Sequence, residues 1–182
     1  MKEDLLKRLL SVLLVSLSCT VYSQTDPYWF SGYKEVIPAA RYEAGWLHEF
    51  FFGSHWRDVW TTKVKVGVID LSKYGGGLTP DEKGGGFQTK SLKFKGADGR
   101  TYKFRSLDKD PKKTLPVELQ ESIARDVVQD QISSSNPYAG FVVNSILDAV
   151  GVYHSDYTLA LLPDDPLLGE YRKEFAGLLG IM

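Results

Sequence analysis

The sequence predicts an α+β fold, in which a small antiparallel sheet with a glycine-rich loop and a hairpin packs with two to three helices. Three observations support this prediction. Apolar and charged residues alternate over residues 92–105 on both sides of a turn, as expected for a hairpin. Apolar residues then recur at helical spacing in residues 116–132 and 138–150. The chain of 182 residues is 43% hydrophobic, enough for one domain with a sizeable core.

The hairpin is the most regular pattern in the chain. Leu92 and Phe94 alternate with lysines before an Asp-Gly turn at residues 98–99, and residues 102–105 alternate in the same way after it. The hairpin is also basic: residues 83–113 hold ten Lys or Arg against three Asp or Glu, whereas residues 114–182 hold three against ten. The net charge of −1 therefore hides a strong separation of charge along the chain.

Three glycines, Gly84, Gly85 and Gly86, directly precede this hairpin. Glycine lets the main chain approach a ligand without an intervening Cβ atom. Exposed N–H groups and cationic side chains add at short range, so we expect an anionic ligand such as a nucleotide phosphate. The alternative is a solvated edge hairpin whose lysines discourage aggregation. A second glycine triplet at residues 75–77 predicts a flexible double loop, which favours the alternative.

The amino terminus has the pattern of a secretory signal peptide, residues 1–23. Lys2, Lys7 and Arg8 precede an apolar run at residues 9–21, and a small residue stands at Ser23 before the predicted cut. The alternative is a membrane-anchoring helix, for which the run is short. The single cysteine, Cys19, lies in this leader, and its flanking leucine stands one position away from that of a lipoprotein signal. The mature chain would have no thiol, which excludes disulfides and zinc–thiolate sites.

After the leader, residues 24–60 form an aromatic-rich segment that either wraps the core or docks on a partner. His48 and His55 in this segment are seven residues apart, which is not a zinc-protease spacing, and we expect no metal site. Residues 61–182 form the predicted α+β domain. Its other expected elements are strands at residues 62–71 and 157–162, helices at residues 116–132 and 138–150, and a last helical pattern at residues 167–179.

Two further features of the domain concern the start of one helix and the carboxyl terminus. Glu118 falls in the first turn of the expected helix 116–132, where the helix dipole alone explains an acid. The chain ends on apolar residues with no polar tail, from which we expect that it stops short of its natural boundary. No run after the leader reaches membrane-spanning length.

The order strand, glycine loop, strand, basic strand and helix is similar to the amino-terminal lobe of kinase-like folds. This resemblance implies that Gly84, Gly85 and Gly86 cover phosphates, with Gln88 and Lys90 beside them. It further implies that Arg105 or Lys103 is the cation that contacts the phosphates, and that Glu118 or Glu121 is the glutamate that orients this cation. Residues 161–164, ending at Asp164, would be the hinge. The aspartates of the catalytic loop and of the magnesium site would lie in a carboxyl-terminal lobe, so ATP with magnesium is implied only if that lobe is supplied.

Several strings also resemble a family of Bacteroidetes-type envelope proteins, known as calcineurin-like phosphoesterase or surface-antigen-like (BamA/TamA-type) outer-membrane proteins. The strings are residues 84–92, 104–111, 128–132, 162–165 and 168–170. In that family a metallophosphoesterase domain can precede the segment, and a β-barrel follows it. The metal-binding strings of the phosphoesterase are missing here, so the resemblance implies no hydrolase activity.

We therefore expect an exported, periplasmic or outer-membrane-associated half-module that binds phosphate or nucleotide and is not catalytic alone. The alternative is a periplasmic interaction module that docks on an outer-membrane β-barrel or a partner domain through its aromatic segment, with the basic hairpin facing lipopolysaccharide phosphates. A free-standing enzyme is the third reading, and the absence of a Gly-x-Ser-x-Gly elbow and of a thiol nucleophile argues against it. We expect no nucleic-acid partner.

Overall fold

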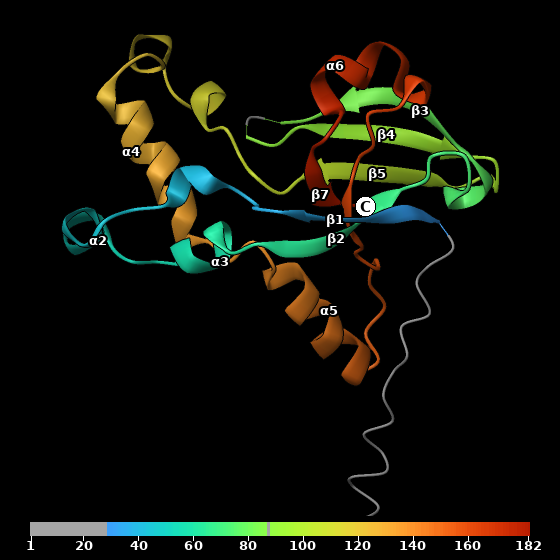
Figure 1. Cartoon of the computed structure of the whole chain (residues 1–182), viewed down its shortest axis with the longest axis horizontal. Coiled ribbons are helices and arrows are strands. Elements are labelled where there is room, and N and C mark those ends of the chain that lie inside the picture. The colour runs from blue at the N-terminus through green and yellow to red at the C-terminus, as the bar shows by residue number, and fades with distance from the viewer. Residues whose placement is uncertain (1–28, 87) are drawn as a thin grey trace, which may run out of the picture.

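A seven-stranded mixed sheet forms the centre of the molecule (Figure 1). The computed structural model describes residues 29–86 and 88–182. Across the sheet the strands follow the order β1 (Phe30–Val36), β2 (Val64–Ile69), β6 (Leu159–Leu161), β7 (Leu179–Ile181), β5 (Thr101–Ser106), β4 (Ser91–Gly96) and β3 (Leu78–Gly84). All neighbours are antiparallel except β2 and β6, which are parallel. The predicted α+β class is confirmed, but the expected small antiparallel sheet is wrong in size and in its purely antiparallel pairing.

The predicted hairpin is formed by β4 and β5. Leu92 lies opposite Phe104 and Phe94 opposite Tyr102, so the apolar side chains share one face of the sheet. Lys93 and Lys103 lie opposite each other on the other face. The turn has Gly99 at a φ of +79°, where glycine is favoured.

Strand β3 replaces the flexible double loop expected between the two glycine triplets. Residues Leu78–Gly84 pair with β4 along their whole length, with one irregularity between Pro80 and Glu82. The sequence did not show this strand because Pro80, charges and glycine occupy most of it. As an edge strand, β3 tolerates proline and charges that a central strand would not.

The apolar carboxyl-terminal residues form a central strand, which corrects the last predicted helix. The helical stretch is limited to a 3₁₀ segment, η6 (Pro166–Tyr171), and one short helix, α6 (Arg172–Phe175). The chain then turns at Gly177, with a φ of +73°, and enters the sheet as β7 between β6 and β5. The partners of this strand lie at least 18 residues away in β6 and at least 74 residues away in β5, so no local pattern revealed it.

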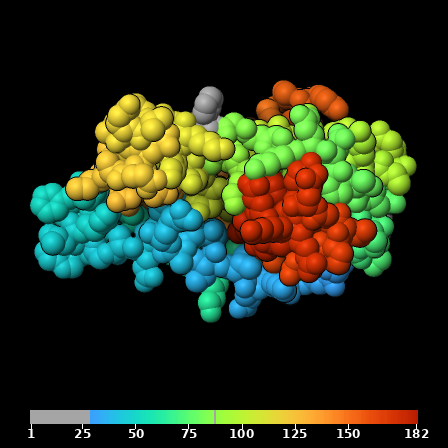
Figure 2. Space-filling view, turned by 90° about the horizontal axis from the view of Figure 1, so that it is seen from above, coloured from blue at the N-terminus to red at the C-terminus, as the bar shows by residue number. Residues whose placement is uncertain are grey.

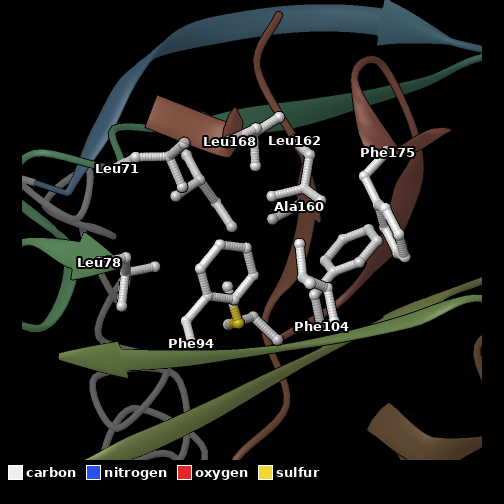
Figure 3. Close-up of a cluster of buried hydrophobic side chains, with 11 residues drawn as sticks. Leu71, Leu78, Phe94, Phe104, Ala160, Leu162, Leu168 and Phe175 are labelled. Carbon is white, nitrogen blue, oxygen red and sulfur yellow. The ribbon is translucent and has the colours of Figure 1, made fainter. Parts of the chain in front are cut away.

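The main core lies on the face of the sheet that η6 and α6 cover (Figure 3). Phe94 and Phe104 of the hairpin point toward Leu168 of η6 and Phe175 of α6, and all four are fully buried. The buried members of this cluster are Ile69, Leu71, Leu78, Leu92, Phe94, Phe104, Ala160, Leu162, Leu168, Phe175 and Met182. Burying this apolar area is the main source of stability for the fold.

The remaining helices lie outside the centre of the sheet (Figure 1). They are α2 (Trp46–Phe52), α3 (Arg57–Thr61), α4 (Ile123–Gln131) and α5 (Ala139–Ala149). The helix predicted at residues 138–150 is confirmed as α5, and the predicted strands 62–71 and 157–162 are confirmed as β2 and β6 with shorter bounds. Short 3₁₀ turns are η1 (Ala40–Tyr42), η2 (Tyr74–Gly76), η3 (Lys112–Thr114), η4 (Val117–Leu119) and η5 (Ile132–Ser134).

The helix expected at residues 116–132 begins later than predicted. Ser122 is the N-cap of α4, and its hydroxyl accepts a hydrogen bond from the Ala124 N–H at 3.2 Å. Glu118 therefore lies in the preceding turn η4 and not in the first turn of the helix. The helical spacing of apolar residues continues through η4, but the helix itself begins only after its N-cap, Ser122.

No helix within residues 29–86 and 88–182 combines the length and the apolar character needed to cross a bilayer. The predicted signal peptide, residues 1–23, lies outside the described residues. The aromatic segment contributes β1, which pairs with β2 at one edge of the sheet.

Candidate anion-binding site

Five of the predicted site residues line one hollow where β3 leads into β4. Gly84, Gly85, Gly86, Gln88 and Lys90 surround a cavity of about 180 Å³. Among the described residues, Thr89 and four charged residues complete the lining. These four are Lys83 before the glycines, Asp110 and Lys113 in the segment after β5, and Glu174 in α6. We call this cavity the glycine hollow.

The three glycines are not equivalent. A Cβ atom at Gly84 would lie 2.8 Å from the Ser91 hydroxyl oxygen. Gly85 has a φ of +131°, and its Cβ would meet the Thr89 carbonyl oxygen at 3.0 Å. A Cβ atom at Gly86 would meet no described atom within 4 Å, and the φ of Gly86 is not positive. A close side-chain contact therefore favours glycine at 84, and a positive φ with a close backbone contact favours it at 85, whereas neither applies at 86.

The wall after the glycines has a fixed backbone. The Ser106 N–H donates to the Lys90 carbonyl at 2.8 Å, and the Lys90 N–H donates to the Ser106 hydroxyl at 3.1 Å. The Asp110 N–H donates to the Gln88 carbonyl at 2.8 Å. Residues 88–90 are thus tied to the end of β5 and to the segment after it, so Gln88 and Lys90 project from a defined position.

Three lysines and two carboxylates surround the hollow, and they are not all neutralised. Lys83 pairs with Glu174 at 2.6 Å. Asp110 lies 3.7 Å from Arg125, a weak contact at the surface. Lys90 and Lys113 form no ion pair with any carboxylate in the described part of the chain. The lining therefore has a net positive charge, with two lysines that form no ion pair next to exposed glycine backbone, and Asp110 is the one carboxylate among the described lining residues that no lysine of the hollow pairs with.

Lys103 and Arg105 do not meet the glycines, which corrects the expected position of the third-strand cation. They line a different cavity, of about 380 Å³, together with Asp156 and Tyr157. Side chains alternate along a strand, so Arg105 lies on the opposite face from Phe104. Glu174 of the glycine hollow belongs to α6, which covers the Phe104 face. Arg105 therefore lines the other cavity and does not belong to the lining of the hollow.

The other two predicted residues also lie apart from the hollow. Glu118 is exposed in η4, and its alternative Glu121 pairs with Lys112. Asp164 accepts a hydrogen bond from the Arg172 Nε at 2.6 Å, and this guanidinium lowers the pKa of the Asp164 carboxyl. Residues 161–164, expected as the hinge, lead from β6 toward η6, and the chain then returns to the centre of the sheet as β7.

The two histidines of the aromatic segment have structural partners. The His48 Nε2 lies 3.1 Å from Asp130, and the His55 Nδ1 lies 3.1 Å from the Ser133 hydroxyl. Within the described residues no group of three or more His, Cys, Asp or Glu side chains could hold a metal ion.

Sequence reasoning missed half of the lining of the glycine hollow. Lys83 and Lys113 lie at the two ends of the basic segment, and its charge density alone could have drawn attention to them. Glu174 is 91 residues from its partner Lys83, and no local signal connects the two.

We compared the chain with family models, curated proteins and solved structures, and nothing in the three comparisons matches it.

Proposed function

We propose that the chain is an exported phosphate- or nucleotide-binding half-module of an envelope protein, without catalysis of its own. The observation that supports this proposal is the glycine hollow itself: Gly86 exposes its backbone beside Lys90 and Lys113, two lysines with no carboxylate partner in the described structure. Backbone N–H groups and cations of this kind stabilise an anion at short range.

The size of the hollow suits one anionic group. Its volume of about 180 Å³ is below the range of roughly 300–1,000 Å³ that is usual for pockets that enclose a whole small molecule. A single phosphate fits this volume, while the rest of a nucleotide would have to lie outside it. The proposal therefore concerns phosphate recognition first.

The proposal uses the element order of the kinase-like resemblance but not its cation–glutamate pair. The elements on which the resemblance rests occur in the expected chain order as β2, the glycine turn, β4, β5, α4 and β6, while β3, α5 and β7 are elements that the resemblance did not include. Against it, Arg105 and Glu118 lie away from the glycines, so the proposed site works without a cation–glutamate pair. ATP with magnesium belongs to the proposal only in the presence of a complementary lobe.

Calorimetric titration of the purified chain with inorganic phosphate, and with ATP and magnesium, tests the proposal. We expect weak binding, with a dissociation constant on the order of millimolar. The Gly86→Val variant should bind several-fold more weakly, since its side chain would fill the approach to the backbone while causing no clash in the fold. Gly32→Val is the matched control, because Gly32 also has an open Cβ position and lies outside the hollow.

Absence of heat and of any thermal shift at millimolar ligand would end this proposal. Equal binding by the wild type and the Gly86→Val variant would show that the anion binds elsewhere.

A second candidate function is a periplasmic interaction module that docks on an outer-membrane barrel or a partner domain. The observation that favours it is α2, none of whose seven described residues is buried. Trp46, Phe50 and Phe51 are 79%, 77% and 71% exposed. Figure 2 shows the segment of α2, in cyan, projecting at one end of the molecule. Large exposed aromatic side chains of this kind are typical anchors of protein interfaces.

Association with envelope fractions distinguishes this candidate. The double variant Trp46→Ser/Phe50→Ser should no longer be retained by envelope extracts, while Ile123→Ser, equally exposed on α4, should behave like the wild type. Retention of the double variant at wild-type levels would exclude docking through α2.

A further inference from the structure

A larger cavity adjoins the glycine hollow at the same end of the sheet. It has a volume of about 430 Å³ and shares Gln88, Lys90 and Asp110 with the hollow. The ends of β3 and β5 and the start of β7 meet at this end (Figure 1). We call it the adjoining cavity. Its size is within the range of pockets that hold small molecules.

The two walls of the adjoining cavity differ in character. One wall is apolar and is formed by the end of β1, the end of β6, the start of β7 and the residues directly after β1 and before β7: Val36, Ile37, Leu161, Leu178 and Leu179. The other wall is polar and contains Arg41, Lys90, Lys109, Ser106, Asp108 and Asp110. A ligand that fits both walls has an apolar body and an anionic end.

A hydrogen-bond network holds the polar wall in place. Asp108 accepts from the Tyr42 hydroxyl at 2.9 Å and pairs with Arg41 at 3.1 Å. Gln129 of α4 donates to the Lys109 carbonyl at 2.9 Å and to the Tyr42 hydroxyl at 2.8 Å. Burial and the neighbouring Asp108 raise the pKa of Tyr42, so its hydroxyl keeps its proton.

This network leaves part of the cationic charge available. Asp108 is engaged with Arg41 and Tyr42, whereas Lys90 and Lys109 form no ion pair with a carboxylate of residues 29–86 and 88–182. Both lysines face the adjoining cavity, and Lys90 also faces the glycine hollow. An anion bound between them would lie at the junction of the two cavities.

We propose that the ligand is a phosphomonoester with an apolar alcohol group, whose phosphate occupies the glycine hollow near Lys90 and whose apolar group lies in the adjoining cavity against Ile37 and Leu178. This inference rests on the proposed phosphate binding and adds the class of molecule. The junction at Lys90 explains why the phosphate pocket can be too small for a whole ligand, since the second cavity receives the remainder.

Phenyl phosphate and inorganic phosphate are the probes, titrated in parallel by calorimetry. Burial of the phenyl ring on the apolar wall should make phenyl phosphate bind about tenfold more tightly than inorganic phosphate. Ile37→Ser should remove this gain while leaving inorganic phosphate binding unchanged, because Ile37 is 40% exposed and its replacement does not open the core. Ile123→Ser is the control, since Ile123 is an exposed isoleucine that lines neither cavity.

The outcomes separate the two proposals. Equal affinities for both probes, or a phenyl gain that survives in Ile37→Ser, would overturn the inference and leave phosphate binding standing. Binding of phenyl phosphate that depends on Ile37, together with no binding of inorganic phosphate, would support the adjoining cavity and exclude the glycine hollow. No binding of either probe would overturn both.

Discussion

Arg57 and Asp130 form a two-pronged salt bridge between the aromatic segment and α4. The two guanidinium nitrogens donate to the two carboxylate oxygens at 2.8 and 2.7 Å, across 73 residues of sequence. Arg57 is only 3% exposed and also donates to the carbonyl oxygens of Gly53 and Tyr42. Nearby, the Trp60 indole N–H donates to the Ser135 carbonyl at 2.9 Å, so the segment is fixed to the helical region at several points.

The Arg57→Ala variant should be strongly destabilised. It leaves the Asp130 carboxylate without its main partner in a mostly buried position, which typically costs roughly 3–5 kcal/mol. Chemical denaturation measures this difference in the free energy of unfolding. Arg41→Ala is the control, because Arg41 forms a similar pair with Asp108 but is half exposed and should cost less than about 1 kcal/mol. If both variants lost a similar free energy of unfolding, burial of the Arg57–Asp130 pair would not explain its contribution to stability.

The same pair predicts an acid-dependent loss of stability. The hydrogen bonds from Arg57 lower the pKa of Asp130 in the folded chain below its unfolded value of about 4. The pair therefore stabilises the fold fully above that value, and its contribution is lost as the pH falls through the lower folded pKa. Thermal unfolding between pH 7 and pH 2 should show a smaller acid loss for Asp130→Asn than for the wild type. Parallel curves for the two proteins would argue against this role of Asp130.

Adjacent glycines should respond differently to substitution. Gly85→Ala should cost about 1–2 kcal/mol, because an alanine at a φ of +131° is strained and its Cβ would approach the Thr89 carbonyl oxygen. Gly86→Ala should leave the free energy of unfolding unchanged or slightly raised, since its conformation and surroundings accept a methyl group. Denaturant unfolding of both variants tests the difference, and equal effects would mean that the turn differs from the one described.

Lys90→Ala should weaken phosphate binding by about three- to tenfold. A charge-assisted contact of an exposed lysine with an anion contributes on the order of 1 kcal/mol. Stability should change by less than about 0.5 kcal/mol, because Lys90 is exposed and has no ion-pair partner among the described residues. Lys103→Ala is the matched control, since Lys103 lies on the same hairpin but lines another cavity. An equal loss of phosphate affinity in both variants would indicate that phosphate responds to the overall positive charge of the hairpin and does not bind at a specific site.

Gly180→Ala should destabilise the centre of the sheet. A Cβ atom at this position would collide with the Arg105 carbonyl oxygen and with the ring of Phe104, which is fully buried in the core. Overpacking of this kind typically costs about 1–3 kcal/mol or more. Gly32→Ala in the edge strand β1 has an open position and should be neutral. A neutral Gly180→Ala variant, measured by thermal unfolding, would contradict the central position of β7.

Elements with local signals were predictable from the sequence. The hairpin of β4 and β5 followed from its alternation and its Asp-Gly turn, and α5 followed from its apolar spacing and the Gly151 stop. Strand β3 had no such signal, because edge pairing with β4 imposes it on a polar sequence. The predicted start of α4 was too early, because the apolar spacing extends to both sides of Ser122 and is a more conspicuous signal than a single N-cap serine.

The candidate site also has one part that local sequence indicated and another part that it did not. Residues close together in sequence, namely Gly84, Gly85, Gly86, Gln88 and Lys90, line one hollow. Residues on other elements could not be assigned, because the face of the sheet on which Arg105 lies depends on strand register relative to the rest of the core. Glu174 and Asp110 join the hollow only through the packing of α6 and of the segment after β5.

By itself, the sequence determined the α+β class, the basic hairpin and the run of glycines before it, since periodicity, turn residues and charge act between near neighbours in the chain. The tertiary structure alone decided that the apolar carboxyl-terminal residues form the central strand β7, that α2 leaves its aromatic side chains exposed, and that Arg105 and the glycines line different cavities. These features depend on pairing and burial between distant segments, whose free energy belongs to the assembled fold and is absent from any local stretch of the chain.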